Sequence, residues 1–352
     1  MAFADEELPL LSDDDTPPVE SRGFAPEQMV RCDVCLRANP PTRSECLYCA
    51  ARLPVTETSQ ELRQPALRRL EKWERGFNCI LLRQPSAPSL SEEELDEAAR
   101  LLRLESATLK RIAENTEPLP LARTATLDDA TLIKDRLAAV RGFEVLIVDD
   151  EALALESRPP LRLRALEFTE NAVVAYPTGG GREQKVSWTQ VSLLVTGRLF
   201  VRRIEVAERR PLSGAEPEIV DAREFGADEA LLDIYVAPDQ ERWDNWRITS
   251  NNFDFSCLGE EKNLLAMHNF RTLIAVLQKK ATSVELSESY YRVRPLLIEV
   301  WPLEQQTEAR GWHRERPGKY STEAAVTSDN EKQFTLYSRL QHHLLMFNRG
   351  LT

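Results

Sequence analysis

The pattern of apolar and polar positions is clearest between residues 77 and 150, where it predicts a compact unit of order β-α-α-β-α-β. Ser91-Glu92-Glu93-Glu94 has the form of a capping box, in which the serine hydroxyl and the last glutamate each bond a backbone N–H of the helix start. Thr126 and Asp129 form a similar start, and Gly142 stands where that helix expects its left-handed cap. We expect strands at 77–83, 119–124 and 143–148, and helices that begin at Ser91, cover 106–115 and begin at Thr126.

Residues 160–282 instead show many short apolar runs with short connections, which is typical of antiparallel strands. A helical run at 260–280 follows them. This order predicts a small antiparallel barrel or sandwich closed by a C-terminal helix. The polar stretch 207–228 is interpreted as an inserted loop. The expected strands are 161–168, 172–176, 184–188, 191–195, 199–206, 231–236, 245–249 and 252–258.

Weaker patterns flank these two regions. Alternating charges at 55–76 predict a solvated helical linker. Residues 283–352 form a C-terminal extension, in which 290–302 fits either a helix or a strand and 305–330 has no regular pattern. Residues 331–347 have the apolar spacing of a helix.

Charge is spread unevenly along the 352 residues, whose net charge is −12. Residues 1–28 carry eight acidic side chains and a single base, Arg22. Such a segment buries too little apolar surface to fold, so we expect a disordered acidic tail. An acidic protein repels phosphates, so nucleic acid binding would require a local basic patch, and none is evident in the sequence.

The sequence contains neither an apolar run long enough to span a membrane nor the pattern of a secretory signal. We therefore expect a cytoplasmic protein. In a reducing compartment, paired cysteines indicate a metal site rather than a disulfide. Cys79 and Cys257 stand alone in apolar runs and are interpreted as buried thiols.

The remaining four cysteines form two CxxC pairs separated by ten residues. Each pair, Cys32 with Cys35 and Cys46 with Cys49, can place two thiolates on one tetrahedral metal. The Asn39-Pro40-Pro41 segment between them suits a turn. We expect a zinc ribbon over residues 29–54 with these four ligands and Zn²⁺ as the metal. A redox dithiol pair and rubredoxin-like iron are the alternatives.

This spacing resembles the zinc ribbons common in bacterial proteins, whose pattern runs CxxC-x3-N-P-x5-CxxC. Asn39 and both knuckles match, while Leu36 and Ala50 replace the glycines that often follow each knuckle. The spacing is also similar to that of the Ran-binding type of zinc finger, but Val30 stands where that family has tryptophan.

Two further resemblances concern the larger regions. The order of elements in 77–150 is similar to the C-terminal domain of the bacterial ribosomal stalk protein and to the adaptor that feeds N-degron substrates to a bacterial protease. Leu104-Glu105-Ser106 replaces the glycine-lysine-rich helix of the stalk domain, and Gln84-Pro85-Ser86 replaces the acidic segment of the adaptor. Residues 160–282, with Lys185-Val186-Ser187-Trp188, resemble a pleckstrin-homology-like domain. The first resemblance implies a domain that grips protein partners, and the second implies a barrel that binds lipids or peptides in some families.

No catalytic motif was found: HExxH, GxSxG and the Walker lysine are absent from the sequence. The run Asp149-Asp150-Glu151 could hold a hard cation, although a solvated loop is the simpler interpretation. The sequence thus predicts a multidomain α+β protein that is not an enzyme and acts as a protein-interaction or regulatory adaptor. A nucleic-acid-associated factor that uses the ribbon is the first alternative, and an enzyme with its site in the β-rich region is the second.

Overall fold

A computed structural model describes residues 24–54, 56, 59, 65–71, 74–83, 91–140, 143–153, 159–211, 218–239, 242–309, 311, 313–316 and 319–350. Contacts between residues divide the chain into a first unit, Met1–Pro65, and a second unit, Ala66–Thr352. Residues 1–23 of the predicted acidic tail, the predicted cap Gly142 and part of the predicted linker lie outside the described residues. The two units are considered one at a time.

Short elements surround the cysteines in the first unit. A 3-10 turn, η2 (Pro26–Gln28), precedes β1 (Val30–Arg31), which pairs antiparallel with β2 (Ala38–Asn39). A second contact between short segments is the antiparallel bridge of Glu45 with Arg52. So few elements bury a very small apolar core, which consists of Val30, Cys32, Cys46 and Leu53.

In the second unit, the first elements follow the predicted order β-α-α-β-α-β. The central strand β3 pairs antiparallel with β4 on one side and β5 on the other. The elements are β3 (Phe77–Arg83), α2 (Glu92–Leu102), α3 (Ser106–Ala113), β4 (Leu119–Thr124), α4 (Leu127–Ala138) and β5 (Phe143–Asp149).

Both predicted helix caps are confirmed. The Ser91 hydroxyl accepts a hydrogen bond from the Glu94 N–H, and the Glu94 carboxylate accepts one from the Ser91 N–H at 2.9 Å. At the start of α4, the Thr126 hydroxyl accepts from the Asp129 N–H at 3.1 Å. These caps satisfy N–H groups that have no partner inside the helix.

A ten-stranded sheet follows, in the order β13-β15-β9-β10-β11-β6-β7-β8, with β12 beside β9 and β14 beside β15. Most pairs are antiparallel as predicted, but β11 pairs parallel with β6 and β12 pairs parallel with β9, so the sheet is mixed. Its first strands and turns are β6 (Leu161–Phe168), β7 (Ala172–Pro177), η3 (Thr178–Gly180), β8 (Gln184–Ser187), η4 (Trp188–Gln190), β9 (Val191–Pro211), β10 (Glu218–Asp239) and β11 (Arg242–Thr249).

The rest of the chain adds helices and returns to the same sheet. Its elements are η5 (Phe255–Glu261), α5 (Ala266–Lys280), β12 (Glu285–Ser287), α6 (Tyr290–Leu297), β13 (Glu304–Ala309), β14 (His313–Arg316), β15 (Lys319–Asp329) and α7 (Glu331–Asn348). The predicted closing helix corresponds to α5, whose apolar face is buried in a core shared with β6, β7, β10 and β11. The prediction of a C-terminal helix at 331–347 is confirmed by α7.

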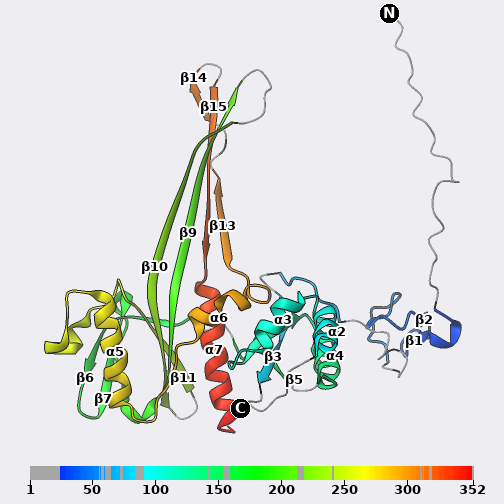
Figure 1. Cartoon of the computed structure of the whole chain (residues 1–352), viewed down its shortest axis with the longest axis horizontal. Helices are drawn as coiled ribbons and strands as arrows, with labels where there is room; N and C mark the ends of the chain where they lie inside the picture. The colour runs from blue at the N-terminus through cyan, green and yellow to red at the C-terminus, as the bar shows by residue number, and fades with distance from the viewer. Residues whose placement is uncertain are drawn as a thin grey trace, which may run out of the picture. The chain divides into compact units, whose positions relative to one another are not determined.

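A long arm is the main departure from the predicted fold. It consists of residues 199–211 of β9 and 218–229 of β10 together with β13, β14 and β15 (Figure 1). The predicted loop at 207–228 was therefore wrong for its described residues, because β9 and β10 remain paired from Arg209 and Glu218 inwards, while 212–217 lie outside the described residues. The prediction of irregular structure at 305–330 was also wrong, since β13, β14 and β15 occupy that stretch.

Two smaller predictions also differ from the structure. The strand expected at 252–258 is largely the 3-10 turn η5, which starts where the Asp254 carboxylate accepts from the Ser256 N–H at 3.0 Å. Of the helical linker expected at 55–76, the described residue Ser59 is helical, whereas the described residues 65–71 and 74–76 contain no helix. Side chains of the second unit hold that segment through its backbone: Arg103 donates to the Leu67 carbonyl and Arg123 to the Glu74 carbonyl, both at 3.0 Å.

One apolar core joins the segment 77–150 to the C-terminal extension, because side chains of α6 and α7 are buried with those of β3, α3 and β5. The helix α7 approaches β9 closely at Gly197, where an added Cβ would lie 2.3 Å from the ring of Phe334. Only glycine leaves room for that ring, so the sequence of β9 is adapted to the helix beside it.

A chain of buried hydrogen bonds follows the same route. The indole N–H of Trp301 donates to Asn78 of β3 at 3.0 Å, and the Trp301 carbonyl accepts from the amide of Gln333 at 2.7 Å. The Tyr290 hydroxyl donates to Gln333 at 3.0 Å and accepts from Asn330 at 2.9 Å. Asn330 in turn binds the backbone of β9 at the base of the arm. The predicted α/β segment is thus tied to the arm by satisfied polar groups as well as by apolar packing.

Candidate metal centre

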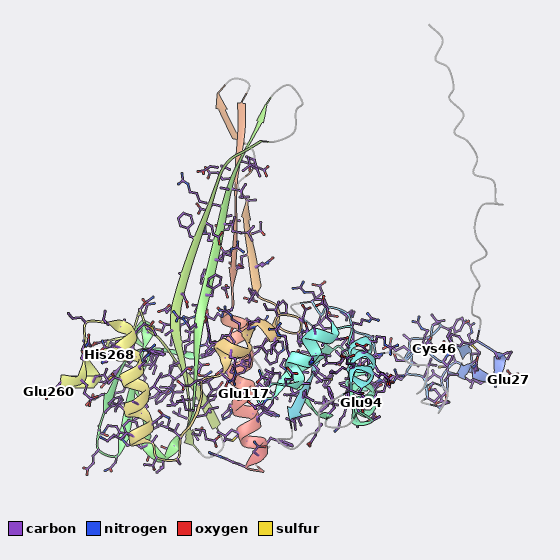
Figure 2. The ribbon with its side chains drawn as sticks, viewed as in Figure 1. Glu27, Cys46, Glu94, Glu117, Glu260 and His268 are labelled. Carbon is purple, nitrogen blue, oxygen red and sulfur yellow. The ribbon has the colours of Figure 1, made fainter. Side chains whose placement is uncertain are left out.

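Four cysteines of the first unit converge on one point. The Sγ atoms of Cys32, Cys35, Cys46 and Cys49 all lie within 4.8 Å of one another, and Cys46 marks the place in Figure 2. Two of the separations are 3.6 Å, between Cys32 and Cys49, and 3.4 Å, between Cys35 and Cys46. Thiolates about 2.3 Å from a tetrahedral metal stand about 3.8 Å apart. The cluster therefore has the dimensions of a tetrathiolate site and can hold a metal ion.

The backbone of both knuckles turns in the same way. The Leu36 N–H donates to the Cys32 carbonyl at 2.9 Å, and the Ala50 N–H donates to the Cys46 carbonyl at 3.0 Å. These turns place Leu36 at φ 61° and Ala50 at φ 57°, in the left-handed region that glycine prefers. They are the two positions at which ribbon sequences often have glycine. The non-glycine residues keep the turn but strain it by about 1 kcal/mol each.

Asn39 connects the two knuckles. Its side chain is fully buried, and its amide oxygen accepts from the Leu47 N–H at 2.8 Å. Its amide nitrogen donates to the Arg37 carbonyl at 2.9 Å and to the Sγ of Cys46 at 3.5 Å. A second donor to that sulfur is the Tyr48 N–H at 3.4 Å. Such contacts orient a ligand and stabilise its thiolate form.

The pKa values of Cys46 and Cys49 are shifted in opposite directions. Burial raises the pKa of Cys46, but N–H donors from Tyr48 and Cys49 outweigh it and hold the pKa at about 6. For Cys49 the Ala51 N–H lowers the pKa, yet desolvation and hydrogen bonds with Cys35 and Cys32 raise it to about 12. Crowded sulfurs cannot all ionise without a counter-charge, and a divalent cation supplies that charge. The donor set therefore fits a metal ion.

With all four positions taken by sulfur, the cluster offers a bound metal no open position for water or substrate. Sites of this kind hold a fold together, whereas catalytic zinc sites keep one position open. The small core of the first unit is consistent with that role, because four buried side chains stabilise a fold only weakly.

The knuckles also expose an unusual amount of apolar surface. Leu36 is 66% exposed, and the guanidinium of Arg37 lies 4.6 Å from the centre of the Tyr48 ring. We define the knuckle patch as the four exposed apolar side chains of the two knuckles: Val34, Leu36, Leu47 and Tyr48.

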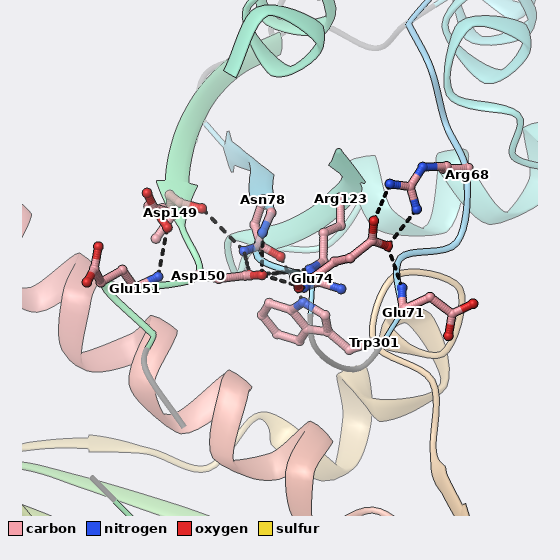
Figure 3. A network of polar contacts seen from close by, with 11 residues as sticks. Arg68, Glu71, Glu74, Asn78, Arg123, Asp149, Asp150, Glu151 and Trp301 are labelled. Carbon is pink, nitrogen blue, oxygen red and sulfur yellow. Dashed lines mark hydrogen bonds and ion pairs between the residues drawn. The ribbon is translucent and has the colours of Figure 1, made fainter. Parts of the chain in front are cut away.

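The acidic run Asp149-Asp150-Glu151 is held by protein contacts. One Asp150 oxygen accepts from the Gly76 N–H at 2.8 Å and the other from the Asn78 amide at 2.8 Å, and the carboxylate pairs with Arg123 (Figure 3). Asp149 accepts from the Glu151 N–H at 2.8 Å. Within the described part of the chain, the four cysteines are the one group of metal-ligating side chains close enough to share an ion.

The two remaining cysteines behave as ordinary thiols. Cys79 is fully buried, and burial raises its pKa to about 12. Cys257 is partly buried, and burial raises its pKa to about 11. Since the thiolate is the reactive form, neither is an activated nucleophile.

His342 stacks on Tyr235 with ring centroids 4.4 Å apart, and its burial lowers its pKa to about 4.

No protein-family model, curated protein or solved structure matches the chain. The resemblances to zinc ribbons, to the stalk and adaptor domains and to pleckstrin-homology-like domains therefore stay predictions. Among the helices of the described residues, none combines the length and the apolar character that crossing a bilayer requires.

The knuckle patch is a feature that the sequence analysis missed. Apart from Asp33, the residues between the paired cysteines and directly after each pair are apolar, and a closed metal site forces such residues outward because the sulfurs occupy the interior. This reasoning could have been applied to the sequence alone, whereas the exposed fraction of each side chain could be obtained only from the structure.

Proposed function

We propose that this protein is a non-enzymatic interaction protein whose Zn²⁺ ribbon, with Cys32, Cys35, Cys46 and Cys49 as ligands, docks a protein partner. The observation that carries the proposal is the knuckle patch beside a closed thiolate cluster. Its members are exposed by 72% at Val34, 66% at Leu36, 53% at Leu47 and 55% at Tyr48. Exposed large apolar side chains gathered on a small folded module are characteristic of an interaction surface.

The composition of the patch supports a protein partner. Tyrosine and arginine are the residue types that contribute most to binding at protein interfaces, and Arg37 stacks on Tyr48 here. The metal would keep both knuckles in one conformation, which reduces the entropy lost on docking. The patch thus combines rigid backbone with exposed apolar area.

Charge gives less support to the alternative, a nucleic-acid factor that uses the ribbon. Residues 24–54 contain the bases Arg31, Arg37, Arg43 and Arg52 and the acids Glu27, Asp33 and Glu45, so four positive charges face three negative ones. Phosphate binding depends on an excess of basic residues.

An enzyme of the β-rich region is not supported either. A cavity of about 570 Å³ is present there, and its lining includes the hydroxyls of Ser187, Thr189 and Ser192. Its one basic side chain, Arg349, is paired with Glu285 at 3.1 Å. The lining contains no histidine, cysteine or carboxylate that could act as a general base or a nucleophile beside those hydroxyls.

The experiment compares partner recovery for two variants of the full chain expressed in its own host. Val34→Ser, Leu47→Ser and Tyr48→Ser together remove most of the patch and leave every sulfur in place. Asp33→Ser is the matched control, because it changes an exposed residue of the same knuckle. We expect a stoichiometric protein partner with the native chain and with the control, and at least a tenfold loss with the triple variant.

Zinc content must stay at about one per chain in all three proteins, so that a loss of partner is not a loss of fold. Equal recovery with the triple variant would contradict docking through the knuckle patch. Recovery that disappears on nuclease treatment, and that is also lost with the triple variant, would favour the alternative of a nucleic-acid factor that uses the ribbon.

A further inference from the structure

The shaft of the arm neutralises its own charges. Arg202 of β9 pairs with Glu224 of β10 at 2.8 Å, and Arg203 pairs with Glu205 at 2.8 Å and with Glu308 of β13 at 3.3 Å. The side chains of these pairs are between 39% and 68% exposed, so their charges compensate one another at the surface of the arm. The shaft therefore offers a polyanion no surplus of positive charge.

The tip of the arm has a different composition. We define the tip as the paired ends of three strands: 209–211 of β9, 319–321 of β15 and 313–316 of β14. Two segments about a hundred residues apart in sequence meet there. Five residues of the tip are basic and one, Glu315, is acidic; the basic ones are Arg209, Arg210, Arg314, Arg316 and Lys319.

The strand register places these residues in rows. Tyr320 of β15 is paired with Arg210 on one side and with Arg314 on the other, so an arginine, a tyrosine and an arginine stand side by side across three strands. At the end of the sheet, the register of the strands places Lys319 opposite Arg316 of β14 and opposite Pro211 of β9. A single acidic residue of β10, Glu218, is paired with Arg209.

The length of the arm separates this positive tip from the acidic body. Pro211 lies twelve residues after Leu199 along β9, which at about 3.3 Å per residue is roughly 40 Å of strand. At physiological ionic strength charges are screened over about 8 Å, so the tip stands about five screening lengths away. The net charge of −12 therefore does not prevent a phosphate backbone from binding at the tip.

We propose that the tip of the arm binds the phosphate backbone of a nucleic acid. Four of the five basic residues are arginine, whose planar guanidinium matches phosphate oxygens better than an ammonium does. Tyrosine, which the register places between two arginines, is a residue type on whose ring bases stack. Paired strands also fit the width of a duplex major groove. This site is separate from the ribbon and goes beyond the proposed protein docking.

The test measures binding of the full chain to labelled duplex DNA, duplex RNA and single strands by fluorescence anisotropy between 0.05 and 0.3 M salt. Three to five phosphate contacts predict a slope of log K against log salt of about −3 to −4.5. Arg210→Gln with Arg314→Gln should weaken binding by about 100-fold at 0.1 M salt and reduce the slope by about 2. The control, Arg271→Gln with Lys279→Gln on α5, removes the same charge from the body and should change binding less than threefold.

Circular dichroism should show both double variants folded, and the triple variant of the knuckle patch should bind nucleic acid as the native chain does. The native chain should bind neither polyglutamate nor vesicles of anionic lipid as tightly as nucleic acid. Tighter binding to those vesicles, or no binding to any nucleic acid at 0.05 M salt, would overturn the proposal. An equal loss of affinity with the α5 control would also overturn the proposal. Binding would then depend on the total charge of the protein and not on the tip.

Discussion

Replacing Trp301 by phenylalanine should destabilise the whole second unit, because the indole N–H is the donor that satisfies Asn78. The bond is 3.0 Å long and both side chains are buried, with Trp301 exposed by 2% and Asn78 by 0%. A buried acceptor left without a partner costs about 1 to 3 kcal/mol. The smaller ring adds about 1 kcal/mol for the space it leaves. We expect a total loss of about 2 to 4 kcal/mol in the free energy of unfolding.

A double-mutant cycle isolates the hydrogen bond from the lost volume. Asn78→Val leaves the indole N–H without its acceptor, while Trp301→Phe with Asn78→Val removes both partners. Asn78→Val also removes the amide's bonds to the Val148 carbonyl and to Asp150. That loss is present in both the single and the double variant and cancels in the cycle, so the double variant should be about 1 to 2 kcal/mol more stable than the sum predicts. Urea unfolding followed by circular dichroism measures the free energies, provided the slope with urea is unchanged.

The matched control is Trp246→Phe with Asn78→Val. Trp246 is also fully buried and also donates its indole N–H, at 2.8 Å, but to Gln184 in the other core. It shares no partner with Asn78, so these two changes should add to within about 0.5 kcal/mol. Additive behaviour in the Trp301 cycle would refute the reasoning, because the Trp301–Asn78 bond would then contribute nothing to the stability of the second unit.

Other predictions concern the ribbon and a buried histidine. Cys46→Ser should abolish metal binding, measured by mass spectrometry of the intact chain, whereas Cys79→Ser should leave it at one ion. Ala50→Gly should raise the stability of the ribbon by up to about 1 kcal/mol, because it relieves the backbone strain at φ 57°. The control Ala51→Gly should not raise it. Competition for zinc with a chelator measures both variants. The pKa of His342 is about 4, against 6.5 for an ordinary histidine, since burial and the nearby charges of His343, Arg349 and Arg339 disfavour its protonation. Between pH 4 and pH 6.5 the unfolded chain therefore binds more protons than the folded chain. The free energy of unfolding should fall by up to about 3 kcal/mol as the pH is lowered from 6.5 to 4. His342→Gln should remove most of this pH dependence, which urea titrations at several pH values measure.

The sequence was sufficient where short-range chemistry decides the structure. The capping box at Ser91 and the cap at Thr126 needed only a few neighbouring residues, and both helices begin there. The same holds for the four cysteines, because two tight turns and one hairpin bring their sulfurs together. Local rules of this kind apply whatever the rest of the chain does.

The arm could not be predicted, because its strands are stabilised by residues far away in sequence. Arg203 forms an ion pair with Glu308, which is about a hundred residues away in the sequence. The described side chains of 221–228 are all exposed, so this stretch lacks the apolar alternation of a half-buried strand. The basic tip is hidden for the same reason: Arg210 and Arg314 become neighbours only through Tyr320 of β15. Sequence periodicity detects burial on one face of a strand, and the arm offers none.

X-ray absorption at the zinc edge tests the central claim, a closed metal site that supports docking and not catalysis. The account predicts about one zinc per chain with four sulfur neighbours at about 2.3 Å and no oxygen or nitrogen neighbour. The spectrum should be the same with and without the partner, because no ligand position is open. A mixed shell of sulfur with water oxygen, or purified protein without zinc and with its four thiols free, would contradict the account.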